Sequence, residues 1–222
     1  MRYLIINADD FGYSQGINCG IIEAHSRGIV TSTSVMVDGV AAEQAHELIN
    51  YENLSIGLHL VITDSEHIEE ELDRQINKFI SIVGRKPDHI DTHKSQPDAK
   101  EEVKQVLKTY AGENNMPVRS FGDAKLIKSF FGLNIDGSGK LNENNVSFAA
   151  FTAAINQATD EYNELMCHVG YSDDFLRQLS SYNDIRENEL KVLTSPEARE
   201  YVREQGLTLC SWRDVRYDKI KP

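Results

Sequence analysis

The chain has 222 residues, of which 40% are hydrophobic, and a formal net charge of −12. This length suits one large α/β domain or two small ones, and the apolar content allows a sizeable core. The acidic balance argues against nucleic-acid and anionic-membrane partners, because both require a basic surface. No apolar stretch approaches the length of a membrane span, and Cys19, Cys167 and Cys210 are too few and too scattered for a disulfide framework. We therefore expect a cytoplasmic protein with reduced thiols.

Strand-like and helix-like patterns alternate along the chain. Short apolar, β-prone runs predict strands near residues 2–7, 30–37, 55–62, 88–93, 117–121, 164–169 and 207–211. Helical spacing of apolar residues predicts helices over 14–27, 65–83 and 98–111. Gly28 and Gly84 follow the first two as C-terminal caps, and Ser195-Pro196 is typical of a helix start.

The repeated order of strand and helix predicts parallel strands joined by right-handed crossovers. About seven such units predict an α/β fold, a distorted (β/α) barrel that is TIM-barrel-like and has mostly parallel strands. An open doubly wound sheet is the alternative. No linker or repeat interrupts the chain, so we expect a single domain over residues 1–222. The polar segment 132–147 is a candidate lid over the site.

The end of the first predicted strand carries two adjacent carboxylates. The apolar run Tyr3-Leu4-Ile5-Ile6 leads directly into Asn7-Ala8-Asp9-Asp10-Phe11-Gly12. One aspartate would be enough to cap a helix, and two beside a buried strand are costly unless a cation or a proton transfer uses them. Residues 10–12 match the magnesium triplet of protein kinases, but the other kinase motifs are absent.

Two histidines stand near the ends of later predicted strands. His59 lies in Gly57-Leu58-His59-Leu60, and His93 ends the run His89-Ile90-Asp91-Thr92-His93. A lone strand histidine is more often a hydrogen-bonded core residue than a ligand, but two of them together with an acidic pair favour metal ligation. The period of two puts His89, Asp91 and His93 on one face, so Asp91 can orient a histidine.

The predicted strand 164–169 brings two further candidates. His168 precedes a glycine turn at Gly170. Its neighbour Cys167 is a conceivable nucleophile, but a thiol within a strand is usually inert packing. Farther back, residues 134–139 have a weak likeness to a calcium loop, but Asn145 stands where the bidentate glutamate is required.

Taken in order, these blocks resemble the YdjC-like carbohydrate deacetylases, the chitooligosaccharide deacetylase family. The resemblance is carried by residues 7–12, 57–60, 87–93, 166–170 and 186–190. It implies a distorted barrel that removes acetyl groups from N-acetylated sugars. It also implies a divalent metal held by Asp10, His59 and His93, with Asp9 as the general base and His168 as the acid. In the last block we assign Arg186 to substrate binding.

Three departures from the family pattern bear on sugar specificity. Ser95 replaces a histidine, Val169 replaces a proline, and the segment after Thr63 is shorter than usual. The Asp/His/His set suits Zn²⁺, with Mg²⁺, Mn²⁺ and Co²⁺ as alternatives. We expect soluble N-acetylated mono- or disaccharides as substrates. The competing hypotheses are a non-catalytic sugar-binding or regulatory barrel and a metal-dependent hydrolase of another bond, such as a phosphoester. Whether the protein forms a homo-oligomer stays open.

Overall fold

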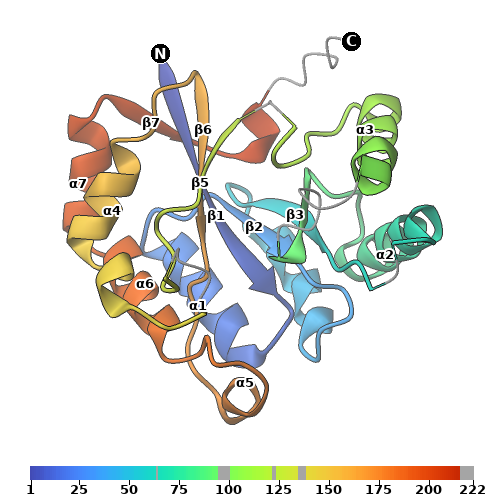
Figure 1. Ribbon diagram of the computed structural model, residues 1–222, viewed down its shortest axis with the longest axis horizontal. Helices are drawn as coiled ribbons and strands as arrows, with labels where there is room; N and C mark the ends of the chain where they lie inside the picture. Colours follow the sequence, from blue (N-terminus) through green and yellow to red (C-terminus); the bar gives the residue numbers. More distant parts are fainter. Residues whose placement is uncertain (64, 95–100, 122–123, 135–138, 216–222) are drawn as a thin grey trace.

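The computed structural model describes residues 1–63, 65–94, 101–121, 124–134 and 139–215, and strands alternate with helices along them (Figure 1). The strands are β1 (Arg2–Phe11), β2 (Ser32–Val35), β3 (Ser55–Leu60), β4 (Ile90–Thr92), β5 (Lys125–Ile127), β6 (Tyr162–Cys167) and β7 (Leu207–Cys210). The α-helices are α1 (Gln15–Ser26), α2 (Ile68–Val83), α3 (Glu101–Asn114), α4 (Phe148–Ile155), α5 (Asp174–Leu179), α6 (Ile185–Leu193) and α7 (Pro196–Glu204). Short 3₁₀ helices are η1 (Ala42–Asn50), η3 (Glu143–Val146) and η4 (Trp212–Asp214).

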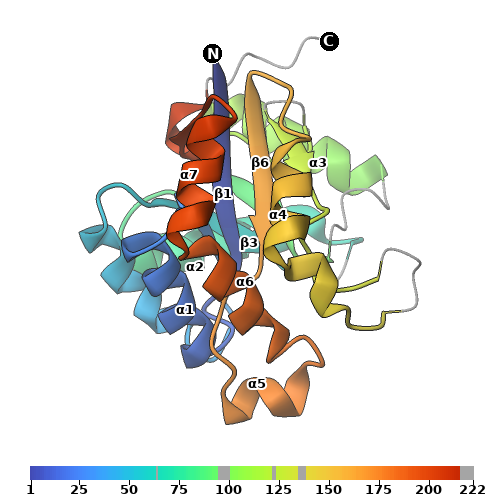
Figure 2. The same ribbon diagram turned by 90° about the vertical axis from the view of Figure 1, so that its left-hand side faces the viewer.

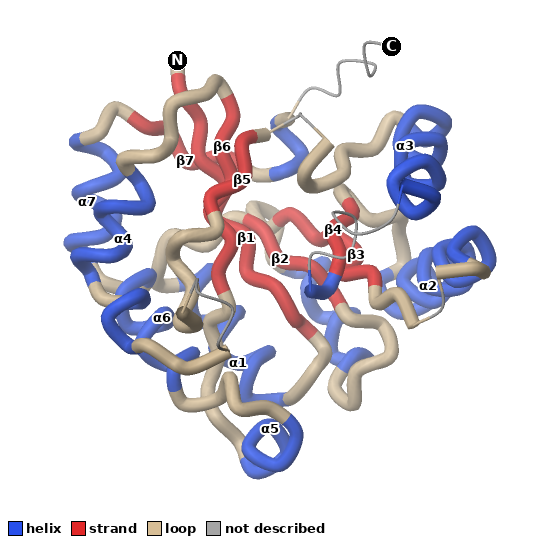
Figure 3. Tube along the Cα trace, in the orientation of Figure 1, coloured by secondary structure: helices blue, strands red, loops and turns tan. Residues whose placement is uncertain are grey.

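The named strands form one sheet in which every pairing is parallel, as predicted (Figure 3). The strand order is β4-β3-β2-β1-β6-β5, and β7 also pairs with β1. Two strands share one edge of β1: β7 pairs with the first half of β1, and β2 pairs with its second half. Strand β6 pairs with the other edge of β1. The result is a curled half-barrel, which confirms the predicted barrel-like class over a flat open sheet.

One predicted strand is wrong. Residues 117–121 form no named strand, and only Val118 makes an isolated parallel bridge, to Ile90 of β4. The extended run cannot continue because Ser120 takes a left-handed conformation with φ of +70°. The strand that pairs with β6 in this part of the chain is β5, which the apolar pattern did not reveal because it has only three residues.

The predicted helices are present as α1, α2 and α3, with small shifts at their ends. Gly84 caps α2 in the left-handed conformation, and the side chain of Ser195 caps α7 by accepting from the Ala198 amide. Gly28 serves a different purpose from the expected cap. The cap of α1 is Arg27, and a Cβ on Gly28 would lie 2.4 Å from the Leu193 carbonyl oxygen, so glycine permits this close approach.

Helices cover the outside of the curled sheet with their apolar stripes. In α2, Leu72, Ile76, Phe79 and Val83 recur at helical spacing and are buried, and the helix contacts β3 and η1. Burial of each such side chain stabilises the fold by roughly 1.5–3 kcal/mol. None of the helices in the described residues is long and apolar enough to span a membrane.

The carboxyl ends of the parallel strands lie at one end of the half-barrel, and α5 lies beyond the ends of β1 and β6 (Figure 2). In barrels of parallel strands, active sites form at this end. The strand-end residues Asp9, Asp10, His59, His93 and His168 are therefore gathered at one place.

Candidate active site

Asp9 and Asp10 are neighbours in sequence, and the backbone turns both toward the same site. In a regular strand their side chains would point to opposite faces of the sheet. The register between β1 and β2 shifts between Ala8 and Phe11, and Asp10 has φ of +73°, which is uncommon for a residue with a Cβ. Backbone strain of this kind gathers at functional sites, where the surrounding structure supports it.

Three ligand-type atoms converge beside this turn. Oδ1 of Asp10 lies 3.2 Å from Nε2 of His59 and 3.4 Å from Nδ1 of His93, and the two nitrogens are 3.2 Å apart. This Oδ1 is buried and has no hydrogen-bond partner among the described residues. A tetrahedral ion with bonds of about 2.0–2.1 Å has ligand atoms about 3.3–3.4 Å apart. The triangle therefore fits a small divalent cation.

His59 is held in the orientation that metal ligation requires. Its Nδ1 lies 2.6 Å from Oδ1 of Asp91 and 3.3 Å from the Ser34 hydroxyl, so Nε2 faces Asp10 and His93. Burial opposes protonation of this ring, but the Asp91 carboxylate, together with Asp10, outweighs burial and raises the pKa of His59 to about 10. A carboxylate behind a histidine is the usual support of a metal ligand, and here Asp91 occupies the place expected of it.

A second group of candidate ligands, Asp9, His59 and Asp91, is already contacted by an arginine. Nη1 and Nη2 of Arg119 each lie 2.7 Å from an oxygen of Asp9, and Nη2 lies 2.9 Å from Asp91. The same guanidinium binds both oxygens of Glu164 at 2.7–3.1 Å. The oxygens of Asp9 and Asp91 are already taken up by these contacts, whereas Oδ1 of Asp10 has no hydrogen-bond partner among the described residues, so this group is a poorer cation site than the first.

Buried carboxyl groups outnumber buried guanidinium groups in the site. Asp9, Asp10, Asp91, Glu164 and Glu189 are buried carboxyl groups, and the guanidinium groups buried with them are those of Arg119 and Arg186. Burial favours protonation of Asp10, but Arg186 together with His59 and His93 outweighs it and holds the pKa of Asp10 well below its usual range. Burial raises the pKa of Glu164 and raises that of Glu189 to about 7.

His168 follows β6 and lies between aromatic rings. Its ring centroid is 4.7 Å from that of Phe131 and 5.7 Å from that of Tyr182. Its backbone amide donates to Oε2 of Glu189 at 2.6 Å, while Nδ1 is buried without a partner among the described residues. Burial lowers the pKa of His168 to about 4, although Asp10 and Asp9 act in the opposite direction. The ring is therefore neutral at pH 7, and its imidazolium form is a strong acid.

Arg186 is more deeply buried than substrate binding alone requires. Its side chain is 5% exposed, and Nη2 donates to Oδ2 of Asp10 at 2.7 Å. Nε donates to the Tyr182 carbonyl oxygen at 2.9 Å, and Nη1 lies 3.5 Å from the His168 carbonyl oxygen. Nη1 thus has the weakest of the three contacts and is the donor most available to a substrate.

Sequence reasoning missed Arg119, Glu164 and Tyr182 as members of the site. The available signal was a charged residue inside a short β-prone run, since Arg119 follows Val118 and Glu164 precedes Leu165. Charged side chains are seldom buried without a partner, so each implied a buried ion pair whose other member the sequence does not identify.

The remaining candidates stay outside the chemistry. Cys167 is buried, its Sγ donates to the Asn7 carbonyl oxygen, and burial raises its pKa well above the usual range, as expected for inert packing. Residues 95 and 135–138 lie outside the described residues, so Ser95 and most of the calcium-like loop have no structural account. The lid assigned to 132–147 stays a prediction.

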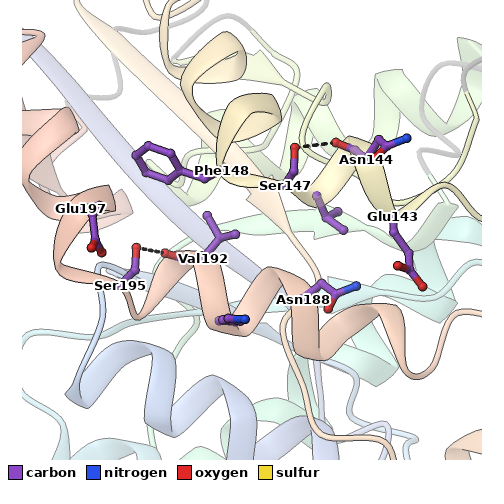
Figure 4. Close-up of a pocket in the computed structure, with 10 residues that line it drawn as sticks. Glu143, Asn144, Ser147, Phe148, Asn188, Val192, Ser195 and Glu197 are labelled. Carbon is purple, nitrogen blue, oxygen red and sulfur yellow. Dashed lines mark hydrogen bonds between the residues drawn. The ribbon is translucent and has the colours of Figure 1, made fainter.

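A pocket of about 470 Å³ lies between the start of α4 and helices α6 and α7 (Figure 4). Glu143, Ser147, Phe148, Asn188 and Lys191 are among its lining residues, which include none of the candidate ligands or catalytic groups. The Ser147 hydroxyl already caps α4 and donates to the Asn144 carbonyl oxygen. This pocket is therefore separate from the candidate active site.

Comparison with known proteins shows which family the chain resembles over most of its length. The family model described as YdjC-like protein matches residues 3–68 and 64–204. A chitooligosaccharide deacetylase from Serratia marcescens is 32% identical over an alignment that covers 96% of this chain and 99% of that protein. Carbohydrate deacetylases from Clostridium beijerinckii and Brevibacillus brevis are 33% and 31% identical, and each alignment covers 96% of this chain and 99% of the relative.

Two solved structures show how far the similarity in fold extends. A protein from Enterococcus faecalis V583, described as a candidate cellobiose-phosphate cleavage protein, has a TM-score of 0.79 and 27% identity, covering 95% of this chain and 97% of its own. A family 4 carbohydrate esterase from Streptomyces lividans in complex with acetate has a TM-score of 0.58 and 14% identity, covering 95% and 91% of the two chains. The second likeness shows a shared fold alone.

Proposed function

The chain belongs to the YdjC-like protein family, and on that premise we propose that it is a metal-dependent hydrolase that removes acetyl groups from small N-acetylated carbohydrates. The names of its relatives, carbohydrate deacetylase and chitooligosaccharide deacetylase, support the reaction and the substrate class. The observation that carries the metal dependence is the triangle formed by Oδ1 of Asp10, Nε2 of His59 and Nδ1 of His93.

The proposed ligands present one carboxylate and two imidazoles, which suits Zn²⁺, with Mg²⁺, Mn²⁺ and Co²⁺ as alternatives. A divalent ion bound there would polarise the acetamide carbonyl and make a water molecule more acidic. Asp91 holds His59 by Nδ1 and so directs its other nitrogen toward the ion. His93 comes from the segment after β4, so the ligand set joins three strand ends.

Asp9 is the proposed general base. It takes a proton from the water that attacks the acetamide carbon, and the fork of Arg119 fixes the plane of its carboxylate. Asn7 donates a further hydrogen bond to Oδ1 of Asp9 at 2.7 Å. With both oxygens already accepting hydrogen bonds, Asp9 has one orientation in which it can meet the water, and such fixed geometry favours the reaction.

His168 is the proposed acid. As the bond between the acetyl carbon and the sugar nitrogen breaks, the nitrogen takes a proton and leaves as a free amine, while the acetyl group leaves as acetate. Burial holds the pKa of His168 near 4, so the ring is neutral before the reaction; in this proposal it receives the proton that Asp9 takes from the water and passes it to the amine. Arg186 completes the set by contacting the substrate through Nη1.

The substrates we propose are soluble mono- and disaccharides in the cytoplasm. The two segments of the family match meet at residues 64–68, directly after Thr63, where we expect a shortened segment. Less chain is then available at this point to surround a long sugar polymer.

A second candidate reaction is cleavage of a phosphorylated sugar. The similarity to the Enterococcus faecalis protein, whose description names a cellobiose phosphate, supports a phosphorylated sugar as substrate. The same ligands would suit a phosphoester substrate, because a divalent ion also stabilises the oxygens of a phosphoryl group.

One assay separates the candidates. Purified protein is loaded with Zn²⁺, Mg²⁺, Mn²⁺ or Co²⁺ and incubated with N-acetylglucosamine, N,N′-diacetylchitobiose and their 6-phosphates, and both acetate and inorganic phosphate are measured. We expect acetate release that requires a metal. Phosphate release without acetate would establish the second candidate. Binding of the sugars with no turnover under any metal would establish a non-catalytic sugar-binding protein.

A further inference from the structure

The guanidinium of Arg186 lies between the two strand ends that carry the proposed chemistry. One side contacts Asp10 at the end of β1, where Nη2 and Oδ2 are 2.7 Å apart. The other side reaches the segment after β6, where Nη1 lies 3.5 Å from the carbonyl oxygen of His168. The group is buried and lies over the Tyr182 ring at 5.2 Å, so its position is fixed by packing as well as by hydrogen bonds.

Helix α6 supplies a second contact to His168 from the same face. Glu189 is three residues after Arg186, so the two side chains share one face of α6. Oε2 of Glu189 accepts from the His168 amide at 2.6 Å, and its other oxygen accepts from the Tyr182 hydroxyl. Tyr182 in turn accepts from Arg186 Nε through its backbone carbonyl. Tyr182, Arg186 and Glu189 therefore form one connected unit, which we call the α6 clamp.

The two oxygens of Asp10 have different surroundings. Oδ2 is occupied by Arg186, whereas Oδ1 has no hydrogen-bond partner among the described residues and faces the two histidines. A carboxylate can bind a cation through one oxygen or through both. With Oδ2 held by a guanidinium, only Oδ1 is free to do so. The left-handed backbone at Asp10 makes this support necessary, since nothing in a regular strand would hold the side chain there.

We propose that Arg186 is a positioning residue that holds Oδ2 of Asp10 so that Oδ1 alone faces His59 and His93, and that the α6 clamp fixes His168 relative to this carboxylate. The clamp thereby sets the distance between the proposed metal ligands and the proposed acid. This inference rests on the proposed metal site. Holding Asp10 is a second role of Arg186, in addition to its proposed contact with the substrate.

The two roles of Arg186 make opposite predictions for Arg186→Lys. Lysine keeps the positive charge but cannot hold Asp10, the Tyr182 carbonyl and the His168 carbonyl together, because it lacks the planar fork. Supporting residues of this kind typically contribute about 10–100-fold in metal affinity or activity. If Arg186 positions Asp10, Arg186→Lys weakens metal binding. If Arg186 only binds substrate, the variant raises KM and binds metal as the wild type does.

The test measures Zn²⁺ and Mn²⁺ affinity of the metal-free proteins by competition with a chromophoric chelator, and kcat and KM for acetate release at saturating metal. Arg177→Lys is the matched control, because Arg177 forms an exposed ion pair with Asp184 in the same region. We expect metal affinity to fall about 10-fold or more in Arg186→Lys and to stay unchanged in Arg177→Lys. Unchanged metal affinity in Arg186→Lys, with the wild type binding metal, overturns the inference.

A second variant tests the His168 end of the clamp and does not depend on how Arg186→Lys folds. Tyr182→Phe keeps the ring and the carbonyl that hold Arg186 and removes the hydroxyl, which donates to Glu189 and accepts from the Gly132 amide. We expect normal metal affinity and a kcat lowered at least 3-fold with little change in KM. A kcat equal to that of the wild type contradicts the clamp. A wild type that binds metal but releases no acetate contradicts the proposed reaction instead, and a wild type that binds no metal contradicts the proposed site.

Discussion

Nη1 and Nη2 of Arg119 donate to the two different oxygens of Asp9, both at 2.7 Å, inside the curled sheet. Arg119 reaches Asp9 from a segment that is 110 residues away in sequence. The same guanidinium also contacts Asp91 and Glu164, so one cation serves three buried carboxylates. This arrangement leads to the first prediction.

Arg119→Met should destabilise the protein strongly. Removing the guanidinium leaves Asp9, Asp91 and Glu164 buried without their cationic partner, and breaking a buried ion pair in this way typically costs about 3–5 kcal/mol. Urea denaturation measures the change in the free energy of unfolding. Arg177→Met removes an exposed arginine from α5 and should leave the midpoint unchanged. Equal midpoints for the two variants would mean that Arg119 does not support the network.

His93→Ala should abolish stoichiometric metal binding. We expect about one divalent ion per wild-type chain, and loss of one of three ligands removes most of the affinity. Elemental analysis after dialysis against trace metal measures the occupancy. His46→Ala is the control, since His46 lies exposed in η1 and its ring hydrogen-bonds the Glu43 carbonyl oxygen of the same helix. Equal metal content in wild type and His93→Ala would remove His93 from the site.

The stability of the protein should depend on pH through Glu189. Burial raises its pKa in the folded protein to about 7, against about 4.3 when unfolded. Between these values the folded state holds a proton that the unfolded state has released, so stability falls as pH rises through this window and levels off above about 7. Glutamine at position 189 does not titrate, so Glu189→Gln lacks this pH dependence. The difference in unfolding free energy between wild type and Glu189→Gln should therefore decline from pH 4 to 7, and a constant difference would contradict the raised pKa.

Small sugars should be better substrates than polymers. The two segments of the family match overlap at residues 64–68, where we expect a shortened segment, and fewer residues beside β3 would leave less surface to hold an extended chain. We expect higher kcat/KM for N-acetylated mono- and disaccharides than for chitin oligomers of six or more sugars. The measurement is acetate release at equal concentration of acetyl groups. Faster release from the long oligomers would show that the proposed substrate size is wrong.

The parts of the site that could be predicted from sequence are those carried by one strand and its end. Asp9 and Asp10 follow an apolar run, His59 lies near the end of another, and Asp91 alternates with His93, so each can be placed by the period of a strand. Because parallel strands end on the same side of a sheet, these residues are expected to lie together. The structure confirms the parallel strands. The TIM-barrel-like prediction did not include the arrangement in which β2 and β7 pair with different halves of the same edge of β1.

What could not be predicted depends on contacts between distant segments. Arg119 reaches Asp9 from outside any named strand, and Arg186 reaches Asp10 across 176 positions. No local pattern encodes these pairs, because an ion pair requires only opposite charges that the fold brings together. The left-handed turn at Asp10 is equally hidden, since an aspartate in a strand-like run normally continues the pleat.

The central claim is that the two adjacent carboxylates have different roles, Asp10 as metal ligand and Asp9 as general base. It is tested most directly by measuring metal content and acetate release of Asp9→Asn and Asp10→Asn side by side. Asparagine keeps the shape of each side chain, but at position 9 it cannot accept a proton. We predict that Asp9→Asn keeps its metal and loses about 10²–10⁴-fold in kcat, whereas Asp10→Asn loses metal affinity. Near-normal turnover of metal-saturated Asp9→Asn would contradict the account.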